Sequence, residues 1–164
     1  MVTQETGVMN LERTDWVRAL TAHPAPLLNA LATKLTAECE VKLTSLPQAG
    51  LGLLTLTDGA FHEPYYLGEF PLSACRLEIG LADGRRADGG AQVLADDAGL
   101  ARSLAILDAI LAARFPGWDT VSEHVASGAR LRSDEDHRRS AILAATRVDF
   151  ALLNNANEDD DETL

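Results

Sequence analysis

The chain has 164 residues, of which 46% are apolar and 24% charged, a composition typical of a soluble globular domain that needs no disulfide or metal to bury a core. Its net charge is −11 and no basic patch is evident, which argues against nucleic-acid binding by this chain alone, because phosphate contacts need clustered Lys and Arg. No apolar run is long enough to cross a membrane, the amino terminus lacks the pattern of a secretory signal, and the two cysteines lie far apart. We therefore expect a cytoplasmic protein with reduced thiols and no membrane partner.

Short helices are predicted near the amino terminus, after a flexible segment over residues 1–12. Thr14 precedes an apolar pattern at helical spacing, which predicts a helix capped by Thr14. The His23-Pro24 step ends this helix, since the residue before a proline disfavours the helical region. A second helix is predicted from an apolar stripe formed by Leu27, Leu28, Leu31 and Leu35.

From residue 39 the apolar period changes to two, which predicts strands in the segments 39–46, 50–59 and 75–94. In the last segment one face is apolar and consists of Cys75, Leu77, Ile79 and Leu81. Asp58-Gly59 and Asp83-Gly84 are turn signals, and the second is typical of a hairpin. Successive hairpin-connected strands predict an antiparallel sheet.

The helical period returns at Asp97 and is interrupted at Pro116-Gly117. The segment 120–131 is ambiguous, and a final helix is predicted to open at Ser133, whose acidic neighbours suit the positive end of a helix dipole. Helices flank the strands rather than alternating with them, which indicates an α+β fold: an antiparallel sheet with helices at both chain ends. We expect one α+β domain over 13–155 and an acidic, disordered tail over 156–164.

The last predicted turns, ATRVDFALLNN (144–154), hold one acid in an apolar arc, because Asp149 lies between Val148 and Phe150. An unpaired buried carboxylate costs several kcal/mol, so Asp149 needs a partner or solvent. Two interpretations stay open. Asp149 either pairs with an arginine of its own chain or becomes exposed as the helix frays, or this helix end docks on another protein that supplies the cation. In the second case Arg147, Asp149 and Phe150 are interface residues.

No residue pattern indicates catalytic or metal chemistry. The histidines lack the paired spacing of a metal-binding helix, so we expect no metal or cofactor and histidines on loops or the surface: His23, His62, His124 and His137. Cys75 has apolar neighbours on its predicted strand, which indicates a buried thiol rather than a nucleophile.

An aromatic cluster follows the predicted Asp58-Gly59 turn and includes Phe61, Tyr65, Tyr66 and Phe70. Two interpretations stay open here as well: core packing, or an interface patch, since aromatic side chains are enriched at binding hot spots. Within it, Gly68 would allow close backbone approach and Glu69 would orient a partner's cation.

Several segments resemble one known family in the expected order over residues 13–154. The ending AATRVDFALL is similar to the Arg-Val-Asp-Phe-Phe signature of the PhnG family, the G subunit of the bacterial carbon–phosphorus lyase core complex. RTDWVRALTAHPAPLLNAL, AGLGLLTLTDGAFHEPYYLGE and LADGRRADGGAQVLADDAGLARSLAILDAIL resemble earlier segments of that family. The chain departs from the pattern at Ala74, where the family commonly has arginine, at 61–65, which replaces a glycine-rich stretch, and at Ala151, where it has an aromatic residue.

The resemblance implies an accessory or structural subunit that associates with the H, I and J subunits of that complex. Such a subunit supports formation of ribose 1-phosphonate 5-triphosphate from a nucleoside triphosphate and an alkylphosphonate, and the transferase chemistry lies mainly in the I subunit. Two alternatives remain: a diverged homo-oligomeric small-molecule binding protein outside the complex, dimeric in isolation, and a stand-alone hydrolase, which the missing catalytic constellation disfavours.

Overall fold

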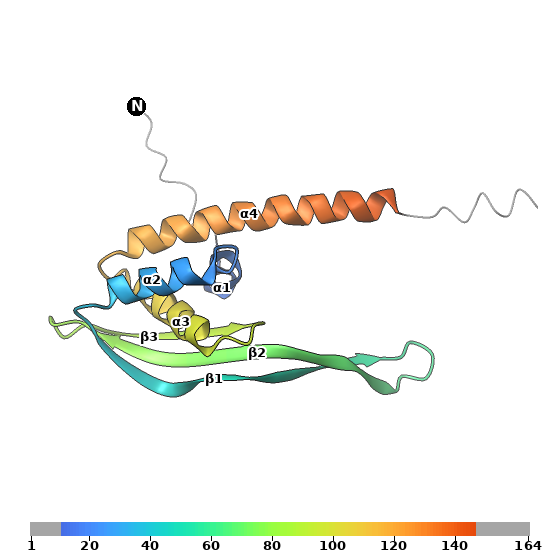
Figure 1. The fold of residues 1–164 in the computed structure, drawn as a ribbon, viewed down its shortest axis with the longest axis horizontal. Coiled ribbons are helices and arrows are strands. Elements are labelled where there is room, and N and C mark those ends of the chain that lie inside the picture. The colour runs from blue at the N-terminus through green and yellow to red at the C-terminus, as the bar shows by residue number, and fades with distance from the viewer. Residues whose placement is uncertain (1–10, 147–164) are drawn as a thin grey trace, which may run out of the picture. The chain divides into compact units, whose positions relative to one another are not determined.

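The structure is a computed structural model that describes residues 11–146, and these form an α+β fold as predicted (Figure 1). The elements follow in the order α1 (Arg13–Leu20), α2 (Ala25–Leu35), β1 (Glu40–Thr57), β2 (Pro64–Gly80), β3 (Arg86–Val93), α3 (Ala98–Ala113) and α4 (Trp118–Ala145). Contacts divide the chain into two units inside α4, between Leu131 and Arg132. The first unit holds the sheet, the first three helices and the first turns of α4. The single domain over 13–155 and its flanking segments stay a prediction.

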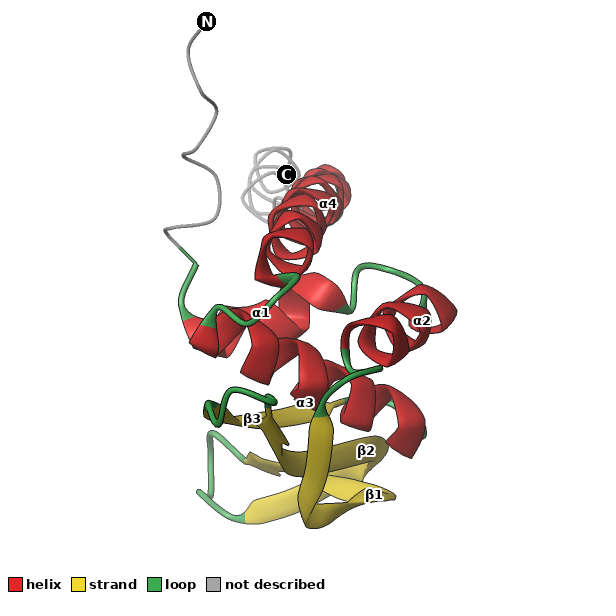
Figure 2. Cartoon of the chain, turned by 90° about the vertical axis from the view of Figure 1, so that its left-hand side faces the viewer, coloured by secondary structure: helices red, strands yellow, loops and turns green. Residues whose placement is uncertain are grey.

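The helices of the first unit gather on one face of the sheet (Figure 2). Side chains alternate between the two faces of a strand, so Cys75, Leu77 and Ile79 point to the helices and are buried, as predicted from their spacing. Helix α3 contacts β2 and β3 on one side and α1 and α2 on the other. Because it lies between two layers, α3 is buried on almost every side rather than along one stripe.

The antiparallel sheet has the strand order β1-β2-β3, and hairpin turns connect neighbouring strands at the predicted Asp-Gly positions. The prediction of separate strands over 39–46 and 50–59 is wrong, because β1 runs through both. Register shifts between Leu43 and Gln48 admit Pro47 into β1 without a break. Proline lacks the N–H that a ladder needs, and β1 is an edge strand where that loss is tolerated.

The amino-terminal helices occupy the predicted regions, but Thr14 is not the cap of the first one. Helix α1 begins at Arg13, and Glu12 takes the cap position without a side-chain hydrogen bond. This shift of two residues places the Arg13 side chain on the helix rather than before it. Helices α1 and α2 are separated at the predicted His23-Pro24 step.

Helix α3 begins where the sequence predicts it. The Asp97 carboxylate accepts a hydrogen bond from the Leu100 N–H at 2.8 Å, which satisfies one of the free donors of the first turn. The helix ends at Ala113, and Arg114 takes a left-handed conformation before the predicted Pro116-Gly117 stop.

The prediction that a final helix opens at Ser133 is wrong. Helix α4 begins at Trp118 and includes the ambiguous segment 120–131. Gly128 weakens the helical pattern in the sequence, but in the structure it is a contact position: a Cβ there would overlap the carbonyl oxygen of Ala19. The glycine therefore lets α4 approach α1, and packing overrides its poor helix propensity.

Candidate functional site

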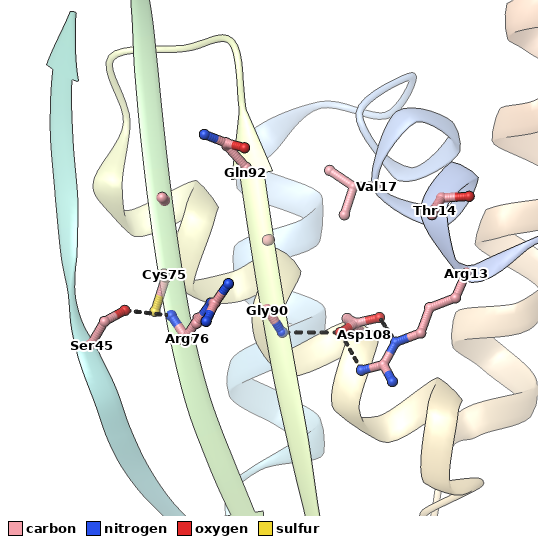
Figure 3. A pocket seen from close by; sticks show the side chains of 11 residues that line it. Arg13, Thr14, Val17, Ser45, Cys75, Arg76, Gly90, Gln92 and Asp108 are labelled. Carbon is pink, nitrogen blue, oxygen red and sulfur yellow. Dashed lines mark hydrogen bonds and ion pairs between the residues drawn. The ribbon is translucent and has the colours of Figure 1, made fainter. Parts of the chain in front are cut away.

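A pocket of about 810 Å³ extends across all three strands of the sheet to α1 and α3 (Figure 3). Its polar lining comes from distant parts of the chain and includes Arg13 on α1, Arg76 on β2, Gln92 on β3 and Asp108 on α3. Strand β3 pairs only with β2 in the described part of the chain, so its other edge presents backbone groups that need partners.

Asp108 and Arg13 close this edge together. The Arg13 guanidinium donates to both carboxylate oxygens of Asp108, at 2.9 and 2.7 Å, and also to the Asp88 carbonyl oxygen at 3.0 Å. Asp108 in turn accepts from the Gly90 N–H at 3.0 Å. The hydrogen bond from Arg13 to Asp108 raises the pKa of the guanidinium above its ordinary value. The pair therefore satisfies two backbone groups at the unpaired edge of β3, the Asp88 carbonyl oxygen and the Gly90 N–H, which a neighbouring strand would otherwise bind.

Arg76 supplies a second cation to the pocket, on the sheet face opposite the helices. Its backbone N–H donates to Ser45 Oγ at 2.9 Å, which joins β2 to β1 at a register shift. Within residues 11–146 its guanidinium has no hydrogen-bond or ion-pair partner. The pocket can therefore bind a ligand that offers acceptor oxygens to Arg76.

Cys75 lines the same pocket but is a poor nucleophile. It is 1% exposed, and desolvation raises the pKa of its thiol, which lowers the thiolate fraction at neutral pH. The predicted interpretation of Cys75 as a buried small apolar residue is confirmed. The polar groups of the pocket can hold and orient a ligand, and neither Cys75 nor the Arg13–Asp108 pair is arranged to attack one.

A second cleft, of about 580 Å³, lies between the end of α2 and the turn that joins β2 to β3. Its lining is mainly apolar and includes Leu35, Cys39 and Phe115. The half-buried Cys39 thiol donates to the Leu35 carbonyl oxygen, and desolvation raises its pKa as well. This cleft offers packing surface rather than reactive groups.

The predicted site residues Gly68 and Glu69 lie on β2, in a part of the sheet that we call the hairpin arm (residues 46–72). Gly68 has a φ of +153°, a conformation that other residues rarely adopt, at the register shift beside Leu54. Nothing lies near the place of its missing side chain, so the glycine serves the backbone bend and not a close approach within the described chain. Glu69 is exposed opposite Leu53. Arg147, Asp149 and Phe150 lie outside the described residues.

The aromatic cluster belongs to the same arm and does not pack in the core. Phe61 is 80% exposed, Tyr66 67% and Tyr65 47%. Phe70 is half-buried because its ring lies over Gly52 on the neighbouring strand. Of the two interpretations left open by the sequence, core packing is wrong for the three exposed rings, and an interface patch remains.

The histidines differ in how far they are exposed to solvent, although the sequence predicted loop or surface positions for all of them. His62 is exposed in the turn of the arm, as expected, but His124 is half-buried on α4, so its expected loop or surface position is wrong. His23 Nε2 lies 2.9 Å from the His124 carbonyl oxygen, and the two rings meet edge to face at 5.3 Å. These contacts pack α4 against the α1–α2 connection.

The residue that sequence analysis missed is Asp108. It stands four positions after Leu104 and three before Leu111, on a helix that is buried on almost every side. The same signal, one acid within an apolar arc, drew attention to Asp149 and could have found Asp108. Its partner Arg13 has no sequence signal, because the two residues are 95 positions apart.

Within residues 11–146, no group of three or more His, Cys, Asp or Glu side chains is arranged to hold a metal ion. No helix in this range combines the length and apolarity that a bilayer crossing requires.

No curated protein matches the chain. The sequence profile of the family described as phosphonate metabolism protein PhnG matches residues 11–154, which is most of the chain and agrees with the segments that resemble that family. The chain therefore belongs to the PhnG family and has a role in phosphonate metabolism.

Proposed function

We propose that the chain is an accessory or structural subunit of the carbon–phosphorus lyase complex in the cytoplasm, with the H, I and J subunits as its partners. In this function it supports formation of ribose 1-phosphonate 5-triphosphate from a nucleoside triphosphate and an alkylphosphonate, without supplying the reacting groups. The family match over residues 11–154 is the observation that carries the proposal. The buried, poorly nucleophilic Cys75 supports a non-catalytic role.

The interface residues of this proposal fall on two segments. Gly68 and Glu69 lie on the hairpin arm, among exposed aromatic side chains. Arg147, Asp149 and Phe150 belong to the carboxyl-terminal segment, where the sequence pattern alone supports them. We propose that Asp149 receives its cation from a partner subunit.

Co-expression with the H, I and J proteins tests the proposal. Tagged full-length chain should retain all three through size-exclusion chromatography, and deletion of its gene should abolish growth on methylphosphonate as the sole phosphorus source. Asp149→Asn should weaken assembly more than it lowers the melting temperature of the isolated chain. If the tagged chain retains none of the three proteins and the isolated chain binds a small ligand, the alternative of a small-molecule binding protein would be favoured instead.

A further inference from the structure

The hairpin arm extends the sheet beyond its third strand (Figure 1). Strand β3 pairs with β2 only over Ser73–Gly80, so residues 64–72 of β2 have β1 as their one strand partner among the described residues. A two-stranded hairpin without a third strand or a packed helix is at best marginally stable in water. The arm therefore needs a covering surface.

Both faces of the arm are apolar. Alternation along β1 places Leu51 and Leu53 on one face and Leu54 and Leu56 on the other. The exposed apolar side chains of the arm, with exposed fractions from 41% to 80%, are Leu46, Leu51, Leu53, Leu54, Leu56, Phe61, Tyr65, Tyr66 and Leu67. Contiguous exposed apolar surface of this kind marks a protein interaction site rather than a solvated strand.

The charges of the arm indicate what covers it. Residues 43–75 contain three acids, Asp58, Glu63 and Glu69, and neither lysine nor arginine. The Asp58 carboxylate caps the turn by accepting from the N–H groups of Ala60 and Phe61. In the described part of the chain, no hydrogen bond or ion pair engages the side chains of Glu63 and Glu69.

A second copy of this chain is a poor occupant for such a surface. It would bring the same three acids against an acidic arm, and the whole chain carries a net charge of −11. Like charges opposite one another in an interface are unfavourable, whereas an arginine or lysine beside Glu63 or Glu69 would be favourable. Charge complementarity therefore selects a different, more basic protein.

We propose that the hairpin arm is the docking element of the chain and inserts into an apolar groove of a different protein, whose rim carries arginine or lysine side chains for Glu63 and Glu69. The inference rests on the proposed function in one respect, since the partner is taken to be another subunit of the complex. Leu51 and Leu53 would fill the groove on the face that continues from the helix-covered core, because Ala49 opposes the buried Ser73.

Assembly with co-expressed H, I and J proteins tests the arm directly. Leu51→Ser with Leu53→Ser should weaken retention of the partners about tenfold or more, as expected for central apolar contacts. Glu63→Lys with Glu69→Lys should weaken this retention too, and should reverse the effect of added salt on assembly.

Matched controls lie outside the arm: Leu27→Ser, at a position 42% exposed on α2, and Glu123→Lys, exposed on α4. All four variants should keep the wild-type melting temperature, because none removes a core residue.

A photo-crosslinking residue at position 53 of the full chain identifies the occupant. Its crosslink within the assembled complex should reach the H, I or J protein at a segment rich in apolar residues and lysine or arginine. A crosslink to a second copy of the chain, or a dimer of the isolated chain that the leucine variants dissociate, would overturn the inference. Normal assembly of the arm variants would also overturn it while leaving the proposed function intact, whereas failure of the wild-type chain to assemble would count against the proposed function itself.

Discussion

Arg13 and Asp108, which are 95 positions apart in the chain, meet through two hydrogen bonds at the open edge of β3. Asp108 is almost fully buried, with 6% of its side chain exposed, whereas 52% of the Arg13 side chain is exposed. A buried carboxylate is stable only when it is paired and hydrogen-bonded, and Arg13 with the Gly90 N–H meets that need. The pair therefore ties the start of α1 to the centre of the fold.

Removing the cation of this pair should destabilise the protein. Arg13→Met leaves the Asp108 carboxylate with the Gly90 N–H alone, so we expect a loss of about 2–3 kcal/mol in the free energy of unfolding, below the range for fully buried pairs because solvent reaches Arg13. Urea denaturation measures it. Arg139→Met, which breaks an exposed pair with Glu135, should change stability by less than about 0.5 kcal/mol. The same small change in both variants would contradict the role of Asp108.

Gly128 should be required for the contact between α1 and α4. Alanine is a better helix former by about 1 kcal/mol, so Gly128→Ala would stabilise an uncontacted helix. Here the added Cβ would overlap the Ala19 carbonyl oxygen, and backbone must move, so we expect a net loss of about 1–3 kcal/mol. Thermal and urea denaturation should show the loss, while Glu123→Ala at an exposed position of α4 should not. A stabilised Gly128→Ala protein would show that the helices do not meet there.

The turn of the hairpin arm should depend on pH through Asp58. Hydrogen bonds from the backbone of Phe61 and Ala60 lower the pKa of this carboxyl. A lowered folded-state pKa means that the stabilisation is present above the unfolded value, about 3.9, and is lost as the pH falls through the folded value. Carbon-detected NMR titration should find Asp58 below its ordinary pKa, and amide protection at Phe61 should fall together with its ionisation. In Asp58→Asn the protection should not follow pH, and an ordinary pKa for Asp58 would contradict the capping role.

Cys75 should resist alkylation in the folded protein. Its thiol is 1% exposed, and desolvation raises its pKa, so both access and thiolate fraction are low. Iodoacetamide labelling followed by mass spectrometry should modify Cys75 only after unfolding in urea, whereas the half-buried Cys39 should react earlier. A Cys75→Ala protein should lose the late-reacting thiol and keep the other. Rapid labelling of Cys75 in the native protein would mean that the sheet opens at β2.

Local sequence patterns correctly predicted features that depend on residues close to one another in the chain. The Asp97 cap of α3, the Asp83-Gly84 hairpin and the alternating face of Cys75, Leu77 and Ile79 depend on neighbours in the sequence, so they could be predicted before the fold was known. Family membership could be identified in the same way, since the order of short motifs over residues 13–154 agrees with the match over 11–154.

The predictions of β1 and α4 were wrong because contacts with distant segments of the chain determine where these elements run. Pro47 suggests the end of a strand, but pairing with β2 carries β1 past it at a register shift. Gly128 suggests a weak helix, but α1 uses the space that its missing side chain leaves. In both cases a tertiary contact outweighs a local preference of about 1 kcal/mol or less.

The sequence by itself determined the α+β class, the start of α3, the hairpin turns and the family, because periodicity, caps and turns act between residues a few positions apart. Only the tertiary structure decided that Asp108 is held by Arg13 and that the aromatic cluster of the arm lies in solvent. The physical reason is that burial and ion pairing depend on which segments pack together, and a pattern along one segment does not contain the position of another.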